Sequence, residues 1–419
     1  MIQPLINISR KQAIWFAIFL VSYEFLIYIA NDMIMPGMLA VVHDFHAPES
    51  KVASSLTAYV LGGASLQLIL GPLSDRYGRR PLMLIGSGLF VVFTLLLPWT
   101  QNIHQFLAGR FIQGMGLCYL NVVGYALLQE IFSDEDAIRL ITIMANIAIL
   151  APLIGPLLGS VFLQYGNWHD LFYMSGGLAA IVFCGLWRFM PESVGQMKRD
   201  GQKIKRSTMT VSAILDNYKT LLRHKVFVFG TVAYGLLGVI CIVWIALSPV
   251  MLVSQAKLSL IMYGVWQIPV FGAFVMGNML LSYLAYRYSV MRLSLVGSGI
   301  VFLSLMLMWL LPMLKGAAPI WLMPGLICYC FGYGFAVTAL NRFILFVTQV
   351  STGTTAALIN TLSMGFQALG ISVANVLYVK SNNLHIAQYA GGIGICYIIL
   401  VVLSFRYHHR EKALKLENL

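Results

Sequence analysis

The feature that most constrains this chain is a succession of apolar runs, each about 20 residues long. As a helix, a run of that length crosses a bilayer core of about 30 Å. Only 10% of the 419 residues are charged, against about 25% in soluble domains. The runs do not alternate in polarity as barrel strands do, so they predict helices. Twelve spans are expected, at about residues 13–41, 52–73, 81–100, 104–129, 139–164, 168–190, 224–251, 258–285, 290–313, 318–347, 353–378 and 386–406.

The distribution of the 27 basic residues predicts the orientation of the chain. Counted over twelve spans, the loops of one side hold only Lys51, Lys257, Lys315 and Lys380. Almost all the other basic residues fall on the opposite side, and loops rich in Lys and Arg stay in the cytoplasm. We therefore expect both termini in the cytoplasm. The net charge of +12 then indicates contacts with anionic membrane lipids and no nucleic-acid partner.

Several patterns that mark enzymes and pumps are absent from the sequence. It contains neither a phosphate-binding G-x-x-x-x-G-K-[ST] nor a zinc-binding H-E-x-x-H segment. The six cysteines all fall within apolar runs and are interpreted as small apolar fillers. We therefore expect no metal, no cofactor and no enzymatic activity.

A long polar break at residues 191–223 divides the expected spans six and six. We predict an N-terminal six-helix bundle at 1–190, a cytoplasmic basic linker at 191–223, and a C-terminal six-helix bundle with a short cytoplasmic tail at 224–419. The fold class is therefore an all-α membrane protein.

An internal repeat supports this division. The segment GPLSDRYGRRPLMLIGSG at 71–88 aligns without a gap on SYLAYRYSVMRLSLVGSG at 282–299, and both end in Gly-Ser-Gly. Each joins the second and third spans of its half. The repeat predicts two pseudo-symmetric bundles that can rock about a site near the membrane midplane.

The first apolar run carries two carboxylates, Glu24 and Asp32. A charge in mid-membrane costs at least about 2.5 kcal/mol, so such groups serve a function or are buried against a partner. A carboxyl group in an apolar setting binds its proton more tightly. We interpret both residues as proton-binding groups that face one cavity. The alternative is a structural role through hydrogen bonds to neighbouring helices.

Arg110 is the one basic residue expected deep within a span. Its guanidinium only donates hydrogen bonds, so it must find acceptors. Gln113 lies one turn away, and backbone carbonyls of the first helix are the other expected partners. The alternative to a functional role is a fixed structural clamp.

The loop between the second and third spans is expected to work as a gating latch. Ion pairs there can hold the ends of neighbouring helices in one state and release them in another. Its glycines allow tight turns and close approach. The alternative is an anchor that only sets topology. The residues of this prediction are Gly71, Asp75, Arg76, Gly78, Arg79 and Arg80.

The segment APLIGPLLGS at 151–160 combines two prolines with two glycines. Pro152 and Pro156 should bend the span, while Gly155 and Gly159 form a G-x-x-x-G face that lets another helix approach. The segment is interpreted either as a seal against leak or as ordinary helix packing.

These segments resemble the major facilitator superfamily. GPLSDRYGRR is similar to its cytoplasmic signature loop, and RFIQG at 110–114 to the fourth-span motif of proton-driven members. APLIGPLLGS resembles the fifth-span antiporter motif, and NDMIMP at 31–36 the first-span motif of twelve-span drug:proton antiporters. The resemblance continues through GYALLQE (124–130), WIALSPV (244–250) and YGVWQIPVFG (263–272).

The resemblance implies a monomeric multidrug and chloramphenicol exporter of the inner membrane of Gram-negative bacteria, driven by the proton gradient. It implies that Asp32 and Glu24 take up protons and recognise cations, with Arg110 tied to proton transfer. It also implies a mostly apolar substrate cavity. The expected cavity residues are Glu24, Tyr28, Asn31, Asp32, Tyr125, Met144, Asn146, Trp244 and Gln267.

The leading interpretation is thus a proton-driven antiporter that exports diverse lipophilic neutral and cationic drugs. The spans of the second half contain no Asp or Glu, so the proton chemistry is expected in the first half. One alternative is a proton-coupled transporter of a single metabolite or sugar, with a narrow substrate range and a more polar cavity. Another is a membrane enzyme or receptor, which predicts no proton flux when substrate is added.

Overall fold

The computed structural model describes residues 4–199, 201, 203–204, 211–378 and 382–417. The chain divides into two compact units, Met1–Thr210 and Val211–Leu419, and the division falls within the expected linker. Both units are helical, and the extended residues that the structure describes form only isolated bridges.

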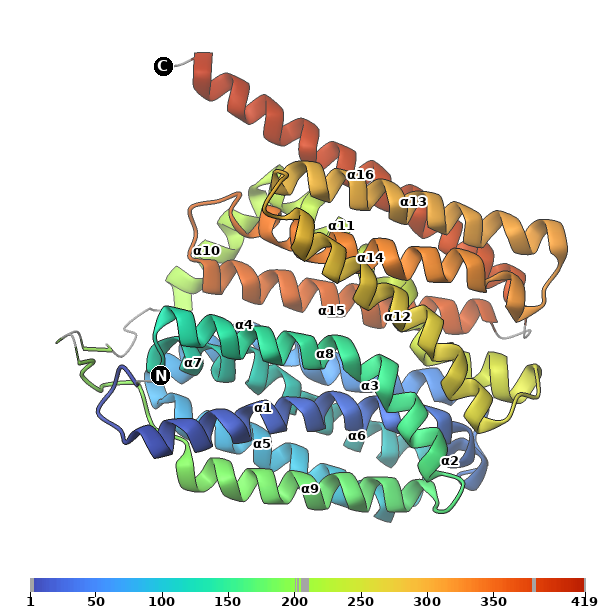
Figure 1. Ribbon diagram of the computed structural model, residues 1–419, viewed down its shortest axis with the longest axis horizontal. Coiled ribbons are helices and arrows are strands. Elements are labelled where there is room, and N and C mark those ends of the chain that lie inside the picture. Colours follow the sequence, from blue (N-terminus) through green and yellow to red (C-terminus); the bar gives the residue numbers. More distant parts are fainter. Residues whose placement is uncertain (1–3, 200, 202, 205–210, 379–381, 418–419) are drawn as a thin grey trace. The chain divides into compact units, whose positions relative to one another are not determined.

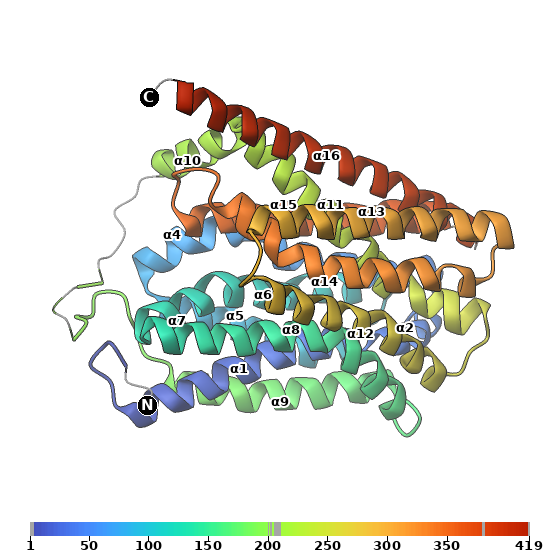
Figure 2. The ribbon, with the colours of Figure 1, turned by 45° about the horizontal axis from the view of Figure 1, so that its top comes forward.

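The long helices of the first unit lie side by side (Figures 1 and 2). A 3₁₀ turn at Met35–Gly37 joins α1 to α2, and a π-helical turn at Leu120–Gly124 joins α6 to α7, so each pair forms one span. The helices are α1 (Arg10–Met33), α2 (Met38–Asp44), α3 (Ser50–Ser65), α4 (Gln67–Tyr77), α5 (Arg79–Leu96), α6 (Ile103–Tyr119), α7 (Tyr125–Ile131), α8 (Asp134–Phe162) and α9 (Trp168–Phe189).

The second unit begins with a short helix and continues with six long ones. A π-helical turn at Pro249–Gln255 extends the first long helix. The helices are α10 (Val211–Arg223), α11 (Lys225–Ser248), α12 (Leu260–Leu284), α13 (Val290–Lys315), α14 (Met323–Leu345), α15 (Thr352–Leu377) and α16 (Asn383–Glu417).

Eleven of the described helices are long and apolar enough to cross a membrane, and α3 with α4 makes a twelfth span. The sequence predicted one continuous helix at 52–73, but α3 and α4 are bent by 42° at Leu66. Side chains compensate for the break. The Ser65 hydroxyl donates to the Gly62 carbonyl at 2.7 Å, and Gln67 Nε2 to the Gly63 carbonyl at 2.8 Å.

Helix starts in both units are fixed by polar N-cap residues, whose side chains accept from the first free backbone N–H groups. At α9 the arrangement is reciprocal, because Asn167 accepts from the Asp170 N–H and Asp170 accepts from the Asn167 N–H. The other N-caps of this kind are Ser9, Asn102, Ser133, Ser259, Ser289 and Ser351.

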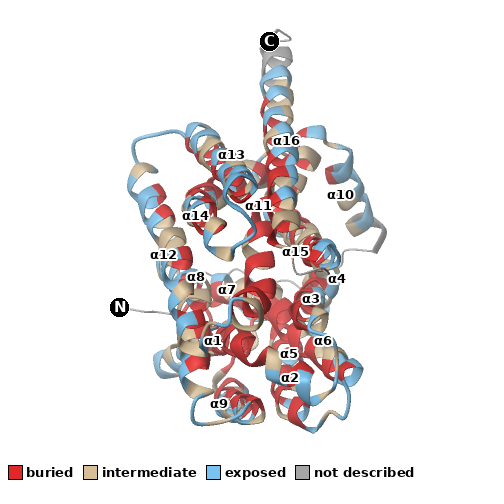
Figure 3. Cartoon of the chain, turned by 90° about the vertical axis from the view of Figure 1, so that its right-hand side faces the viewer, coloured by how far each residue is buried: buried red, intermediate tan, exposed pale blue. Residues whose placement is uncertain are grey.

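Burial follows the packing within each unit. Figure 3 shows buried positions gathered along α1 and α11, and exposed positions along the outer sides of α9 and α12. Many exposed side chains on the long helices are large and apolar, such as Ile181, Met279 and Leu303. Exposure of so much apolar surface to water is unfavourable, whereas the acyl chains of a bilayer can cover it.

The expected linker contains a helix that was not predicted. Within the polar break at 191–223, residues 211–223 form the helix α10, which packs on α11 and α15. Its Leu221 is buried, while Leu215 and Leu222 are exposed. The apolar residues Ile214, Tyr218 and Leu221 recur at the helical spacing of three and four residues, so this helix could have been predicted from the sequence.

Candidate functional site

The carboxylates of the first span lie in the interior of the first unit. Asp32 is in the last turn of α1, which ends at Met33 because Pro36 follows and cannot continue the helix. Glu24 is fully buried, and Asp32 is 4% exposed. Neither takes part in any ion pair formed by the described residues.

Arg110 of α6 is fully buried and lies among neutral acceptors. Its Nε donates to Ser55 Oγ at 3.2 Å, Nη1 to Gln113 Oε1 at 2.5 Å, and Nη2 to Asn31 Oδ1 at 2.5 Å. Its guanidinium carbon also lies 4.7 Å from the ring centroid of Tyr59, a cation–π distance. The expected contact with Gln113 is present. The acceptor from the first helix is the Asn31 side chain, in place of the backbone carbonyls that the sequence suggested.

Asn31 also contacts Asp32. Its Nδ2 donates to Asp32 Oδ1 at 3.1 Å, so one amide group connects the guanidinium of Arg110 to the carboxylate of Asp32. Asn31 was predicted to line the substrate cavity, and its position between Arg110 and Asp32 was not predicted.

Glu24 lies two turns before Asp32 and has a separate partner. The hydroxyl of Tyr125 donates to Glu24 Oε1 at 2.8 Å. The other oxygen, Oε2, is buried and has no hydrogen-bond partner among the described residues. The two carboxylates thus share a helix, and each is bound to a different neighbour.

The antiporter-like segment packs directly on the site. Gly155 and Gly159 of α8 face the last turn of α1. A Cβ on Gly155 would lie 2.6 Å from the Asp32 Cβ, and one on Gly159 would collide with the Met33 carbonyl oxygen. Pro152 and Pro156 lie within the same continuous helix. The small residues therefore let α8 approach the backbone that carries Asp32.

The expected latch loop contains a network of charged groups. Arg79 Nη1 lies 2.6 Å from Asp75 Oδ1. The same guanidinium donates to both carboxylate oxygens of Glu130 at the end of α7, at 2.7 and 3.3 Å, a bidentate contact. Glu192, after α9, accepts from the backbone N–H groups of Arg79 and Arg80 at 2.9 and 3.1 Å.

Glu130 and Glu192 were not predicted as members of this site. Glu130 ends the quoted segment GYALLQE, and Glu192 follows the last span of the first half. The only available signal was an acid at the end of an apolar run, on the side where basic residues gather.

The remaining loop residues differ in what they contact. Gly78 has φ 111°, a left-handed conformation that favours glycine. The Arg80 side chain donates to the Trp187 carbonyl at 2.8 Å, and the Arg76 guanidinium lies 5.5 Å from the Tyr77 ring centroid. Gly71 was expected to serve a turn or a close approach. It lies inside α4, and the nearest atom to an added Cβ is 3.8 Å away, so that expectation was wrong.

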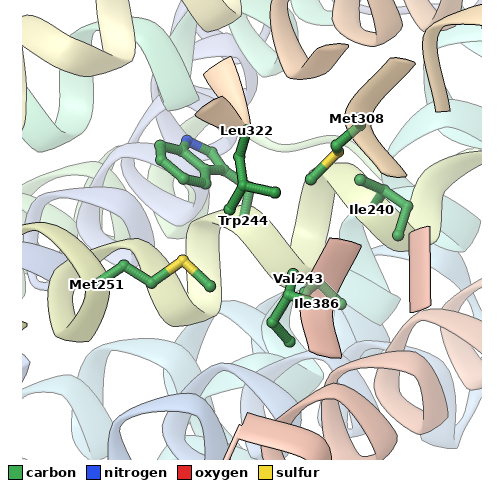
Figure 4. A pocket seen from close by; sticks show the side chains of 7 residues that line it. All are labelled: Ile240, Val243, Trp244, Met251, Met308, Leu322 and Ile386. Carbon is green, nitrogen blue, oxygen red and sulfur yellow. The ribbon is translucent and has the colours of Figure 1, made fainter. Parts of the chain in front are cut away.

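The other expected cavity residues lie in both units. In the first unit, Tyr28 is half-buried, Met144 is buried and Asn146 is exposed. In the second, the indole N–H of Trp244 donates to Gln267 Oε1 at 2.7 Å. Trp244 also lines an apolar pocket within the second unit (Figure 4), whose lining residues are Ile240, Val243, Trp244, Met251, Met308, Leu322 and Ile386.

Comparison with known sequences identifies relatives of this chain. A family model described as Major Facilitator Superfamily matches residues 20–373. A protein named "Multidrug transporter MdfA" from Yersinia pestis bv. Antiqua (strain Angola) is 40% identical over 403 residues, 96% of each chain. The protein of the same name from Escherichia coli O6:H1 is 40% identical over 373 residues, 89% of each chain.

Solved structures share the fold. A bacterial homologue of the human lysosomal transporter Spinster has a TM-score of 0.68 at 13% identity, over 96% of this chain and 98% of its own. A D-xylose–proton symporter has a TM-score of 0.70 at 16% identity, over 92% and 97%. At such identities the likeness concerns the fold alone, and it confirms the predicted fold class. This chain is a multi-pass membrane protein and belongs to the major facilitator superfamily.

Proposed function

We propose that this protein is a proton-driven antiporter that exports structurally diverse lipophilic drugs, neutral and cationic, from the cytoplasm by alternating access. Chloramphenicol-like compounds are expected among its substrates. Relatives that are 40% identical over 96% of the chain and are named multidrug transporters support the multidrug part of this proposal.

The observation that carries the antiport part is the pair of buried carboxylates on α1. Asp32 and Glu24 are buried in the first unit, and no described cation lies within ion-pair distance of either. A buried carboxylate without a paired cation is costly when charged and readily accepts a proton. A drug that displaces this proton, and a proton that displaces the drug, would give exchange.

The proton gradient supplies enough free energy for this exchange. One proton that enters across 100 mV releases about 2.3 kcal/mol, and each unit of pH difference adds about 1.4 kcal/mol. Each tenfold concentration ratio of a neutral drug requires about 1.4 kcal/mol. A single proton per drug is therefore sufficient for a gradient of tenfold or more.

The contacts of the first unit support an orientation with both termini in the cytoplasm. The Leu5 N–H donates to the Ile131 carbonyl at 2.6 Å, and the Arg199 N–H donates to the Leu5 carbonyl at 2.7 Å. The N-terminal segment, the end of α7 and the segment after α9 therefore meet at one end of this unit. Arg79 and Arg80 lie at the same end, because they bind Glu130 and Glu192. Basic residues at one end favour the cytoplasmic side of an inner membrane.

The test uses inside-out membrane vesicles with an acidic interior. Neutral and quaternary-ammonium drugs are added, and proton release is followed with a pH-sensitive dye. Release with several unrelated drugs supports the proposal. Release with none, from vesicles that hold their gradient and contain the protein, excludes multidrug antiport. A dedicated metabolite transporter would respond to one compound class only.

Replacing Asp32 by Asn is expected to abolish drug-induced proton release and drug resistance. The amide keeps the volume of the carboxylate but cannot exchange a proton. Asp134→Asn is the matched control, because Asp134 is exposed at the start of α8. Full resistance from an Asp32→Asn protein of normal abundance would refute the assigned role.

Replacing Glu24 by Gln is expected to weaken the export of cationic drugs about tenfold and to leave neutral drugs nearly unchanged. The buried carboxylate supplies the negative charge that a cation needs, and one lost charge interaction of this kind is worth on the order of a factor of ten. Tyr125→Phe controls for the hydrogen bond between Tyr125 and Glu24. Equal losses for neutral and cationic drugs would contradict this assignment.

A further inference from the structure

We propose that Asn31 is a positioning residue that transmits the charge of Arg110 to Asp32, and thereby sets the pH at which Asp32 exchanges its proton. This inference rests on the proposed proton antiport and adds to it the group that joins the two charged residues.

The orientation of the Asn31 amide follows from the chemistry of its neighbours. Arginine has only donors, so the atom that faces Arg110 Nη2 at 2.5 Å must be the carbonyl oxygen of Asn31. The amino group of Asn31 then faces Asp32 Oδ1 at 3.1 Å. A buried guanidinium thus fixes which end of the amide is presented to the carboxylate.

A second amide shows the same polarity on the other side of Arg110. Gln113 accepts from Arg110 Nη1 through Oε1 at 2.5 Å, and its Nε2 donates to Thr94 Oγ1 at 2.8 Å. Both amides turn their carbonyl oxygens to the guanidinium and their amino groups away. Only the amino group of Asn31 points at a titratable group. Gln113 is therefore a matched control within the same network.

Few charged groups act on Asp32. Arg110 of α6 and the hydroxyl of Tyr59 of α3 are its electrostatic neighbours. On α1 the titratable groups near Asp32 are Tyr28, about one turn away, and Glu24, two turns away, and α8 presents Gly155 to Asp32. Among the described residues, α8 and α9 contribute no charged group that acts on Asp32. The Asn31 amide is therefore the direct donor to this carboxylate.

The amino group stabilises the charged form of Asp32 more than the neutral form, because hydrogen bonds to charged groups are stronger. The guanidinium polarises the amide and strengthens this donor. When the donor is removed, Asp32 should hold its proton up to a higher pH. An amide that only held Arg110 in place would not have this effect.

The test measures drug-induced proton release from the purified, full-length protein in detergent as a function of pH. The readout is the pH at which released protons per protein fall to half. For Asn31→Leu we expect this midpoint to rise by about one unit, the size of one hydrogen bond to a charged group. For Gln113→Leu we expect no change in the midpoint, although the amount of folded protein can fall.

A second variant keeps the test decisive if Asn31→Leu does not fold. In Asn31→Thr the hydroxyl can still accept from Arg110, while its single O–H is satisfied by a carbonyl of its own helix. We expect the same rise in the midpoint. Wild-type midpoints in both Asn31 variants, or an equal rise in Gln113→Leu, would overturn the proposal. So would failure of Asn31→Thr to fold while Gln113→Leu folds, since Asn31 would then be structural.

Failure of the inference can be told from failure of the proposed function. If the wild-type protein releases no proton with any drug, proton antiport itself is refuted, and the inference with it. If the wild-type protein releases protons with a midpoint that the Asn31 variants do not move, antiport stands and the role of Asn31 does not.

Discussion

Two helix crossings, one in each unit, are built in the same way. In the first unit α3 crosses α6, and in the second α12 crosses α14. At each crossing, each helix contributes one glycine, which lies three residues after an aromatic residue of the same helix. Each glycine faces the backbone of the other helix, and an added Cβ would collide with the carbonyl oxygen of that helix's aromatic residue. The contacts are Gly62 with Phe111 and Gly114 with Tyr59, and Gly277 with Phe331 and Gly334 with Phe274.

The side chains at the two crossings differ in charge. In the first unit, Arg110 lies over the ring of Tyr59 and binds Gln113. When Gly114 is aligned with Gly334 and Gly62 with Gly277, Arg110 corresponds to Cys330, Tyr59 to Phe274 and Gln113 to Tyr333. There the rings of Phe274 and Tyr333 pack at 5.0 Å.

The comparison separates packing from chemistry. The same backbone approach accommodates a buried cation in one unit and neutral side chains in the other. No Asp or Glu occurs between residues 225 and 410. The glycines are therefore needed for helix packing in both units, while the charged groups of the first unit are not needed for this packing and are available for the proposed proton exchange.

The largest expected effect follows from the shared part of the comparison. Gly114→Ala and Gly334→Ala should each prevent their helices from approaching, because the added Cβ meets backbone that cannot move aside. Overpacking of a core usually costs about 1–3 kcal/mol, and a clash with backbone lies at or above the upper end. We expect little monodisperse protein on size-exclusion chromatography for both variants.

The controls for this prediction are Gly177→Ala in α9 and Gly299→Ala in α13. An added Cβ has nothing within 4 Å at either position, and alanine favours helix more than glycine by about 1 kcal/mol. Both controls should fold normally. Normal folding of only one of the two crossing variants would show that the crossings are not equivalent.

The second-largest expected effect concerns the buried cation Arg110, which is present only at the crossing of the first unit. Arg110→Met keeps most of the side-chain volume and removes the charge, so we expect folded protein with at least tenfold less drug-induced proton release. Arg110→Lys should recover little, because a single ammonium cannot reproduce the three-sided contact with Ser55, Gln113 and Asn31.

Cys330→Ala is the matched change in the second unit and should leave proton release within about twofold of wild type, since a buried thiol behaves as a small apolar group. A loss with Cys330→Ala as large as that with Arg110→Met would remove the functional difference between the crossings.

The spans could be predicted from the sequence because 20-residue apolar runs have few alternatives in a membrane. Their ends agree with the structure to within a few residues, except at α16, which continues to Glu417 where the sequence predicted an end near residue 406. The break at Leu66 was not predicted, although Gly62, Gly63 and Ser65 directly before it are residues of the kind found at helix kinks. The freed carbonyls are satisfied by Ser65 and Gln67, which also fit a continuous helix.

The candidate site could be predicted only in its parts. Glu24, Asp32 and Arg110 stand out because charges are rare in apolar runs. The hydrogen bonds between them could not be predicted, because Asn31 and Arg110 are separated by 79 positions in the sequence. Glu130 and Glu192 reach Arg79 across 51 and 113 residues. A single sequence carries no signal for such pairings.

The smallest expected effect concerns the repeated loop. In the first unit the backbone N–H groups at the start of α5 donate to Glu192, from a distant segment, and Gly78 provides no side-chain cap. In the second unit Ser289 caps α13 locally, by accepting from the Arg292 N–H at 3.4 Å. Glu192→Ala frees the two donors at the start of α5, and also the N–H groups of Ser193 and Val194, which donate to the same carboxylate. It also removes a charge favourable to a helix start, whereas Ser289→Ala leaves one donor free.

We therefore expect Glu192→Ala to destabilise the protein by about 2 kcal/mol and Ser289→Ala by about 1 kcal/mol or less. The measurement is the apparent melting temperature in detergent, with Glu192→Gln as the control that keeps an acceptor and loses the charge. Equal shifts for the two alanine variants would mean that the distant carboxylate acts as an ordinary cap. A shift for Glu192→Gln near that of Glu192→Ala would assign most of its effect to charge, which acts on the start of α5 and on Arg79.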